Sequence, residues 1–238
     1  MGKLIAYLFM AGKMGKLLTT GGTMLISMFV YSFVFGWPYA VGIVLLILVH
    51  EMGHYIAARQ KGLDVGAPTF IPFVGAWINL KDKPMDVHTE AYVAFAGPLV
   101  GTIGAIACYW VARYINSQLM LALAYSSFMI NLFNLIPISP LDGGRITAII
   151  SPKVWLFGVP LLAALFFYRP SPMLILIAVL AIPQIKLALR KDGGASEMPE
   201  DYYNVPVETR VNYAVFYLGL AGFLAIMSYL LHDMLGKV

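Results

Sequence analysis

The chain is poor in charged residues. Only 12% of its 238 residues are Asp, Glu, Lys or Arg, whereas 60% are hydrophobic and the mean hydropathy is +0.79. A soluble domain carries about twice that charged fraction, so an ordinary soluble globular protein is excluded. The apolar residues are gathered in long runs, which is typical of a polytopic membrane protein.

Cysteine is also scarce. The single cysteine, Cys108, lies inside an apolar run, which excludes an intrachain disulfide and a cysteine-based metal site; we expect it to be a small buried residue. The net charge is +4, but the basic residues alternate between loops, as membrane topology requires. We therefore expect a lipid bilayer around the chain and no nucleic-acid partner.

The long apolar runs predict six or seven transmembrane helices, since one crossing needs roughly 20 mostly apolar residues. The expected spans are residues 17–35, 39–58, 91–114, 119–136 and 213–231, with one or two shorter spans in 154–185. Within 154–185, the stretch Arg169-Pro170-Ser171-Pro172 should break a helix. The predicted fold class is an all-α polytopic membrane protein with a single integral-membrane domain, residues 1–238.

Two segments do not fit a membrane span. Residues 62–84 hold three prolines among β-favouring apolar residues, and we expect a short membrane-associated β-hairpin or sheet there, after the second span. Residues 191–210 are polar and acidic, with two glycines and two prolines. That composition predicts a cytoplasmic linker between the helices of a C-terminal part, residues 154–238.

The distribution of lysine and arginine gives an orientation. Loops rich and poor in these residues alternate along the chain when residues 154–185 cross twice. The excess of positive charge on the cytoplasmic side then places the N-terminus and the end of the second span in the cytoplasm. We expect a multi-pass protein of a prokaryotic cell membrane.

The most informative motif is His50-Glu51-Met52-Gly53-His54, which directly follows the apolar run 40–49. Ionisable residues at membrane depth are rare and are by default functional candidates. On a helix, His50 and His54 lie one turn apart on the same face, a spacing at which two imidazoles can bind one Zn²⁺ ion. Glu51 is then free to act as a base. The motif therefore predicts a zinc site.

A catalytic zinc site usually has three protein ligands and an open position. In the run from Asn134 to Arg145, Pro137 and Pro140 end the fourth span and leave irregular backbone. Such backbone is tolerated in a bilayer only beside protein or a wet cavity. Asp142 follows, and Gly143-Gly144 give the chain freedom to bring its carboxylate to another helix. We expect Asp142 to be the third ligand; its alternative role is to cap the next helix.

These motifs resemble those of the site-2 proteases, the intramembrane zinc metalloproteases of peptidase family M50. The resemblance rests on the histidine motif and on Asn134, Pro137 and Pro140-Leu141-Asp142-Gly143, and two further stretches, 70–75 and 96–98, are similar. It covers about residues 20–150, the expected catalytic core. The PDZ and CBS domains that many members carry have no counterpart in the sequence.

The resemblance implies an endopeptidase that hydrolyses peptide bonds in or near transmembrane segments of protein or peptide substrates, as in regulated intramembrane proteolysis. It implies one Zn²⁺ ion bound by His50, His54 and Asp142, with Glu51 as general base. It further implies that Asn134 helps hold the substrate backbone or the developing oxyanion. Strands at about 65–80 would accept an extended substrate segment by edge pairing.

Other functions stay open at this point. A prenyl-protein protease would take a glutamate as third ligand, for which Glu90 is the nearby candidate. A metal-binding transporter or a non-catalytic scaffold would also use the histidines; a transporter should show repeat symmetry, which the sequence lacks. For Asn131, packing polarity within the fourth span is the expected role, and for His88, Glu90 and His232 it is an interfacial position.

Overall fold

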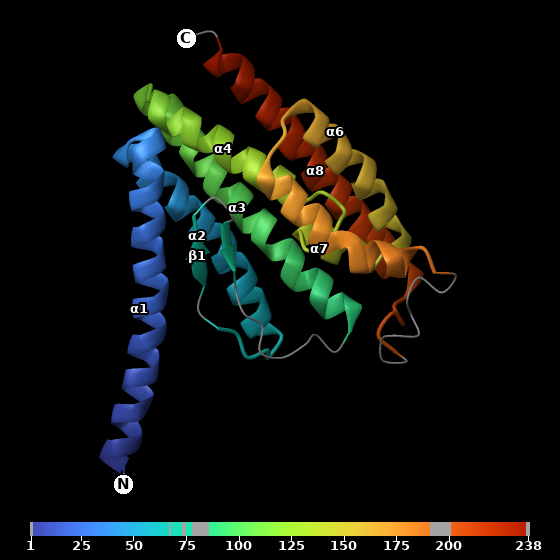
Figure 1. Ribbon diagram of the computed structural model, residues 1–238, viewed down its shortest axis with the longest axis horizontal. Helices are drawn as coiled ribbons and strands as arrows, with labels where there is room; N and C mark the ends of the chain where they lie inside the picture. Colours follow the sequence, from blue (N-terminus) through green and yellow to red (C-terminus); the bar gives the residue numbers. More distant parts are fainter. Residues whose placement is uncertain (1, 67, 73–74, 78–85, 191–200, 237–238) are drawn as a thin grey trace.

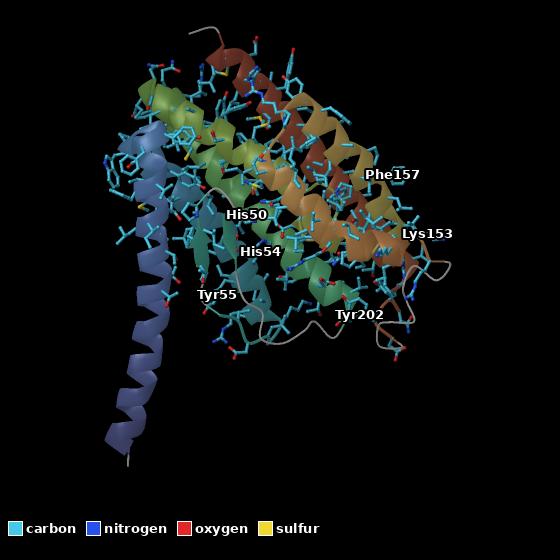
Figure 2. The ribbon with its side chains drawn as sticks, in the orientation of Figure 1. His50, His54, Tyr55, Lys153, Phe157 and Tyr202 are labelled. Atoms are coloured by element: carbon cyan, nitrogen blue, oxygen red, sulfur yellow. The ribbon has the colours of Figure 1, made fainter. Side chains whose placement is uncertain are left out.

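The fold is a bundle of long helices with one small strand pair at its side (Figure 1). The computed structural model describes residues 2–66, 68–72, 75–77, 86–190 and 201–236, with side chains from residue 19 onward except in 75–77. Helices α3, α4 and α8 lie along one another in the bundle, and the first half of α1 projects away from it (Figure 1). Figure 2 adds the side chains in the same orientation.

The elements in chain order are α1 (Gly2–Phe35), α2 (Trp37–Gln60), β1 (Thr69–Ile71), β2 (Gly75–Trp77), α3 (Val87–Ile115), α4 (Gln118–Asn134), α5 (Asp142–Ala148), the 3₁₀ helix η1 (Pro152–Phe157), α6 (Gly158–Tyr168), α7 (Pro172–Ala188) and α8 (Val207–Leu235). The chain is therefore predominantly helical, as predicted. The break expected near residue 170 lies between α6 and α7.

Local signals explain several helix ends. Asp86 caps α3 by accepting a hydrogen bond from the amide of Thr89 (2.7 Å), and Ser117 caps α4 in the same way. Gly36, with φ of 78°, makes the turn between α1 and α2 in the left-handed region that glycine tolerates best. These are the cap and turn residues that the helix termini require.

Three helices in the described part of the chain, α2, α3 and α8, are long and apolar enough to cross a membrane. Shorter apolar helices are residues 19–35 of α1, η1 with α6, and α7. The predicted total of six or seven crossings stays a prediction. So does the orientation.

Glycines allow α2, α3 and α4 to approach closely. A Cβ on Gly53 of α2 would collide with the main chain of α3 at Ala96, and one on Gly42 would collide with Leu123 of α4. Small residues at helix contacts are typical of membrane bundles, where close backbone approach replaces the hydrophobic driving force. This close contact positions the functional side chains described below.

The strand pair is attached to α1. Strands β1 and β2 are antiparallel, with Phe70 opposite Ala76. The Thr20 hydroxyl donates to the carbonyl of Pro68 (2.6 Å), and the Thr23 hydroxyl accepts from the amide of Phe70 (3.1 Å). Three residues of each strand pair at the place where the sequence predicts a membrane-associated β-hairpin or sheet; that hairpin stays a prediction.

The linker expected at 191–210 stays a prediction, and its last residues make defined contacts. Residues 191–200 lie outside the described residues, but α8 begins at Val207, within the expected linker. Tyr202 is buried, and its carbonyl accepts a hydrogen bond from the amide of Val87 (3.0 Å). Arg210 donates to the carbonyls of Ile149 and Tyr203. Arg210 supplies several donors at once, so these contacts hold residues 201–206 against the rest of the chain.

Candidate metal centre

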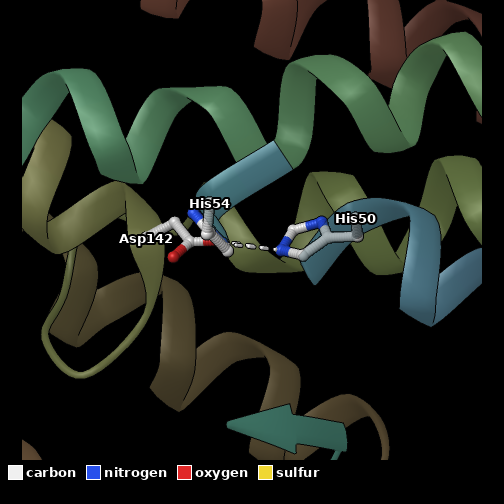
Figure 3. A group of neighbouring side chains, drawn as sticks. All are labelled: His50, His54 and Asp142. Carbon is white, nitrogen blue, oxygen red and sulfur yellow. Dashed lines mark hydrogen bonds and ion pairs between the residues drawn. The ribbon is translucent and has the colours of Figure 1, made fainter. Parts of the chain in front are cut away.

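Two histidines of α2 and one aspartate of α5 converge inside the bundle (Figure 3). The Nε2 atoms of His50 and His54 are 3.1 Å apart. The Oδ2 atom of Asp142 lies 3.2 Å from Nε2 of His50 and 3.3 Å from Nε2 of His54. The structure thus brings together the three side chains that the sequence predicted as ligands.

The three donor atoms have the spacing of a zinc site. With bonds of about 2.0–2.1 Å, tetrahedral coordination places neighbouring donor atoms about 3.3–3.4 Å apart. The observed separations of 3.1, 3.2 and 3.3 Å are close to this expected distance between donor atoms. Three such donors occupy one face of a tetrahedron and leave a fourth position for a water or a substrate group.

The other nitrogen of each imidazole is held by an acceptor. Nδ1 of His54 is 2.8 Å from the carbonyl oxygen of Val93 on α3. Nδ1 of His50 is 2.8 Å from Oδ1 of Asn131 on α4. A carbonyl oxygen can only accept, so each Nδ1 carries a proton, and in the neutral ring Nε2 faces the centre with a lone pair. Such contacts orient metal-binding histidines in general.

The orientation of Asn131 follows from its own hydrogen bond. Its Nδ2 group donates to the carbonyl of Ser127 (2.7 Å), which leaves Oδ1 to accept from His50. The side chain is buried, with 1% exposed. Asn131 therefore orients a candidate ligand directly, a contact that the sequence did not predict because its partner is 81 residues away.

This arrangement favours a cation chemically. With both rings neutral, two imidazole lone pairs and a carboxylate oxygen meet without a donor among them. Acceptors at such distances repel one another, and a shared cation removes the repulsion. The donor set of two imidazoles and one carboxylate suits Zn²⁺.

Two glycines of α3 provide the space for these side chains. A Cβ on Gly97 would overlap the imidazole of His54, and a Cβ on Gly101 would overlap the amide of Asn131. Gly97 belongs to the stretch 96–98 that already resembled the family. The need for glycine there is steric, since both residues lie in a regular helix.

Asp142 is the first residue of α5, and the chain reaches it through an irregular segment, residues 135–141. Gly143 and Gly144 have no room for a Cβ, because it would collide with the main chain of that segment. Neither glycine has a positive φ in the described structure. The pair is therefore required for close packing of backbone on backbone, and not for the conformational freedom that the sequence suggested.

Glu51 is buried, with 8% exposed. Its carboxylate is close enough to His50, Asp142 and Arg145 to interact electrostatically with all three. Asn134 ends α4 and is partly buried; among the described residues it makes no hydrogen bond to the three candidate ligands.

The remaining histidines lie elsewhere. His88 packs edge-on against Tyr213, and His232 packs against Tyr125. Cys108 is a partly buried free thiol within the apolar core. None of the three belongs to the cluster of possible metal ligands found among the described residues.

Comparison with known proteins shows what the region around the histidine motif is similar to. Residues 38–119 match the model of Peptidase family M50. We call residues 38–119 the M50 segment because of this match. The resemblance to the site-2 proteases is thereby confirmed, and the M50 segment contains the whole of α3 and all of α2 except Trp37. Asp142 lies beyond the matched residues.

Curated relatives of the chain are zinc metalloproteases by name. The zinc metalloprotease MJ0392 of Methanocaldococcus jannaschii is 33% identical over 113 residues, which are 45% of this chain and 32% of that protein. The putative zinc metalloprotease Rip3 of Mycobacterium tuberculosis is 32% identical over 116 residues, 45% of this chain and 29% of the relative. The chain thus spans about a third of the length of these relatives.

Among solved structures, the site-2 protease from Methanocaldococcus jannaschii aligns with a TM-score of 0.45 and 23% identity. The alignment covers 77% of this chain and 87% of that one.

Proposed function

We propose that the chain is an intramembrane zinc endopeptidase of the site-2 protease type. The observation that carries the proposal is the spacing of the three acceptor atoms of His50, His54 and Asp142, at 3.1–3.3 Å from one another. The M50 segment and the names of the relatives support it. In this proposal residues 1–238 form one integral-membrane domain with a catalytic core at about 20–150.

The proposed setting is a multi-pass protein in a prokaryotic cell membrane, with the N-terminus and the end of α2 in the cytoplasm. Helix α2 is one of the apolar helices of spanning length, and both histidines lie near its C-terminal end. A site there is reachable by water from the membrane surface, which hydrolysis requires.

His50, His54 and Asp142 would hold the zinc ion. When bound, Zn²⁺ lowers the pKa of water to about 7 and polarises the scissile carbonyl. Glu51 accepts a proton from the attacking water and returns it to the leaving amine. Its burial removes bulk water that would compete for that proton. Asn134 is proposed to hold the substrate backbone or the developing oxyanion.

The strand pair is the proposed docking site for an unwound substrate segment. The amide of Phe70 points to Thr23 of α1 and thus away from β2. In an antiparallel pair, the N–H and C=O groups of two directly opposite residues either both face the partner strand or both face away from it. Phe70 lies opposite Ala76, so the N–H and C=O groups of Ala76 point away from β1. Since α1 occupies the outer side of β1, we expect the substrate to pair with β2 at Ala76.

The test is Glu51→Gln in the full chain, reconstituted in membranes with a model transmembrane substrate. We expect cleavage to be lost while zinc stays bound, because Gln cannot accept the proton. Glu208→Gln, at an exposed position in the first turn of α8, is the matched control and should cleave normally. Retained cleavage in Glu51→Gln with zinc bound would disprove the mechanism.

Metal content tests the ligand set. His54→Ala and Asp142→Ala should both lose zinc, because each removes one of three protein ligands. Retention of zinc at the parental affinity in Asp142→Ala would remove Asp142 from the set. That outcome would also support a scaffold or a different metallopeptidase over the site-2 protease reading.

A further inference from the structure

Arg145 is a cation beside the metal centre that the ligand set does not use. It lies on α5 three residues after Asp142, and residues three apart on a helix face the same side. Its guanidinium is close enough to Glu51 and His54 to interact electrostatically with both. Arg145 therefore belongs to the surroundings of the metal centre.

Two residues from other elements hold this arginine. Oε1 of Glu90, on α3, lies 4.0 Å from Nε of Arg145. The other carboxylate oxygen of Glu90 accepts a hydrogen bond from the hydroxyl of Tyr202. Tyr202 is itself buried and bonded through its carbonyl to Val87. Glu90 is thus fixed at one oxygen and faces the arginine with the other.

The far end of the guanidinium is left available. The ion pair with Glu90 involves Nε, and within the described part of the chain neither terminal nitrogen of Arg145 has a hydrogen-bond partner. The side chain is 37% exposed, so water or a ligand can reach it. A guanidinium with two free terminal nitrogens presents a planar fork that fits a carboxylate.

We propose that Arg145 binds a carboxylate of the peptide at the metal centre, with Glu90 and Tyr202 as its positioning residues. The inference rests on the proposed endopeptidase function. Hydrolysis breaks the peptide C–N bond, adds the water oxygen to the carbonyl carbon and moves protons to the leaving nitrogen, so one fragment ends in a new carboxylate. A Glu or Asp side chain near the scissile bond offers the same chemistry.

The experiment measures binding, so it does not depend on turnover. The full chain with Glu51→Gln, zinc-loaded and in detergent, is titrated with three fluorescent apolar peptides of otherwise identical sequence. One ends in a carboxylate, one in an amide, and one in an amide with a single internal Glu near its end. We expect the carboxylate peptide to bind about tenfold more tightly than the amide peptide, as a charge-assisted pair allows.

Substitution separates the arginine from the metal as the source of that preference. Arg145→Gln should bring the two dissociation constants within about twofold, and Arg145→Lys should keep part of the preference, since lysine keeps the charge without the fork. Arg113→Gln, at the opposite end of α3, removes a cation of the same kind and should change nothing. If the internal-Glu peptide binds more tightly than the plain amide peptide, Arg145 recognises a substrate side chain. If only the peptide with the C-terminal carboxylate binds more tightly, Arg145 recognises the product.

Two outcomes overturn the proposal. Equal affinity for acid and amide peptides in the parent chain shows that the site has no carboxylate preference, and an unchanged preference in Arg145→Gln assigns it to the metal. If Arg145→Gln does not fold, Glu90→Gln is the deciding variant, because it keeps the arginine and removes the carboxylate that pairs with Nε. The preference for the carboxylate peptide should then fall, and an unchanged preference would contradict the positioning role of Glu90. Absence of cleavage by the parent chain, which keeps Glu51, together with an intact carboxylate preference would count against the endopeptidase proposal alone.

Discussion

The sharpest test of the metal centre is Gly97→Ala. This substitution adds one methyl group to α3, and the three atoms nearest to it would all belong to the imidazole of His54. No main-chain atom is among them, so the perturbation is directed at one candidate ligand. His54 must turn away, which also breaks its contact with the carbonyl of Val93 at 2.8 Å.

The expected size of the effect follows from two opposed contributions. Alanine is favoured over glycine within a helix by about 0.5–1 kcal/mol, so the helix itself gains slightly. Loss of an orienting contact to a metal-binding histidine lowers metal affinity by about 10–100-fold, which corresponds to about 1.4–2.7 kcal/mol. Because the ligand atom is displaced as well, we expect zinc affinity to fall by at least the upper part of that range.

The assay is a competition titration of zinc against a chelator on the purified chain in detergent, with circular dichroism to confirm the helical content. Gly219→Ala on α8 is the matched control, because a Cβ there meets nothing within 4 Å. A Cβ in Gly104→Ala, on α3 itself, meets only the side chains of Val49 at 3.1 Å and Leu46 at 3.3 Å, so this variant should bind zinc nearly normally. A Gly97→Ala chain with zinc affinity within twofold of the parent would refute the placement of His54.

Three further predictions follow from contacts around the site. Asn131→Leu should lower zinc affinity by about 10–100-fold because it removes the acceptor for His50, whereas Asn134→Leu should leave it unchanged; equal losses in the same titration would contradict the different roles given to the two asparagines. Thr23→Val should speed amide hydrogen exchange at Phe70 by roughly fivefold, since it removes an acceptor worth about 1 kcal/mol. Thr23→Ser keeps a hydroxyl and should restore protection; equal exchange in the two variants would contradict a hydrogen bond between α1 and β1. Burial, and then the carboxylate of Glu90, raise the pKa of Tyr202 above its ordinary value, so the folded chain keeps a proton that the unfolded chain loses above about pH 10. The contribution of Tyr202 to stability is therefore full below that pH and declines above it. In thermal unfolding scans, Tyr202→Phe should make the loss of stability at alkaline pH shallower, and an identical slope would contradict this linkage.

The three side chains that meet at the candidate metal centre could be predicted from the sequence because their signal is local. His50 and His54 are four residues apart on one helix, so helical periodicity alone brings them together. Asp142 follows a proline-broken helix, which marks an unusual backbone at membrane depth. Each of these features is visible in a window of a dozen residues.

The supporting contacts could not be predicted in the same way. Asn131 reaches His50 only because α2 and α4 pack together over a separation of 81 residues. Tyr202 lies in a segment whose polar composition indicated a solvated linker, and it is buried because Glu90 and Arg210 bind that segment from distant elements. Composition reports what a segment can form alone, whereas these residues are held by partners far along the chain.

The length of α1 illustrates a different limit. Hydropathy placed the start of the first span at residue 17, yet the helix begins at Gly2. Lys3, Lys13 and Lys16 lower the hydropathy of the earlier residues without breaking the helix, since lysine is a good helix former. Hydropathy therefore reports the part suited to lipid, and helix propensity the full extent of the element.

The two halves of the metal centre are positioned by different means. The histidines lie on one long helix, and contacts from α3 and α4 fix their rings at Val93 and Asn131. Asp142 lies on a helix of only seven residues. Backbone packing at Gly143 and Gly144 holds this helix in place. The Trp155 indole also holds it by donating a hydrogen bond to the carbonyl of Gly144 (2.7 Å). Neither set of contacts involves a metal ion. Because these contacts come from the protein itself, a cation would meet a preorganised set of donor atoms instead of having to assemble the site.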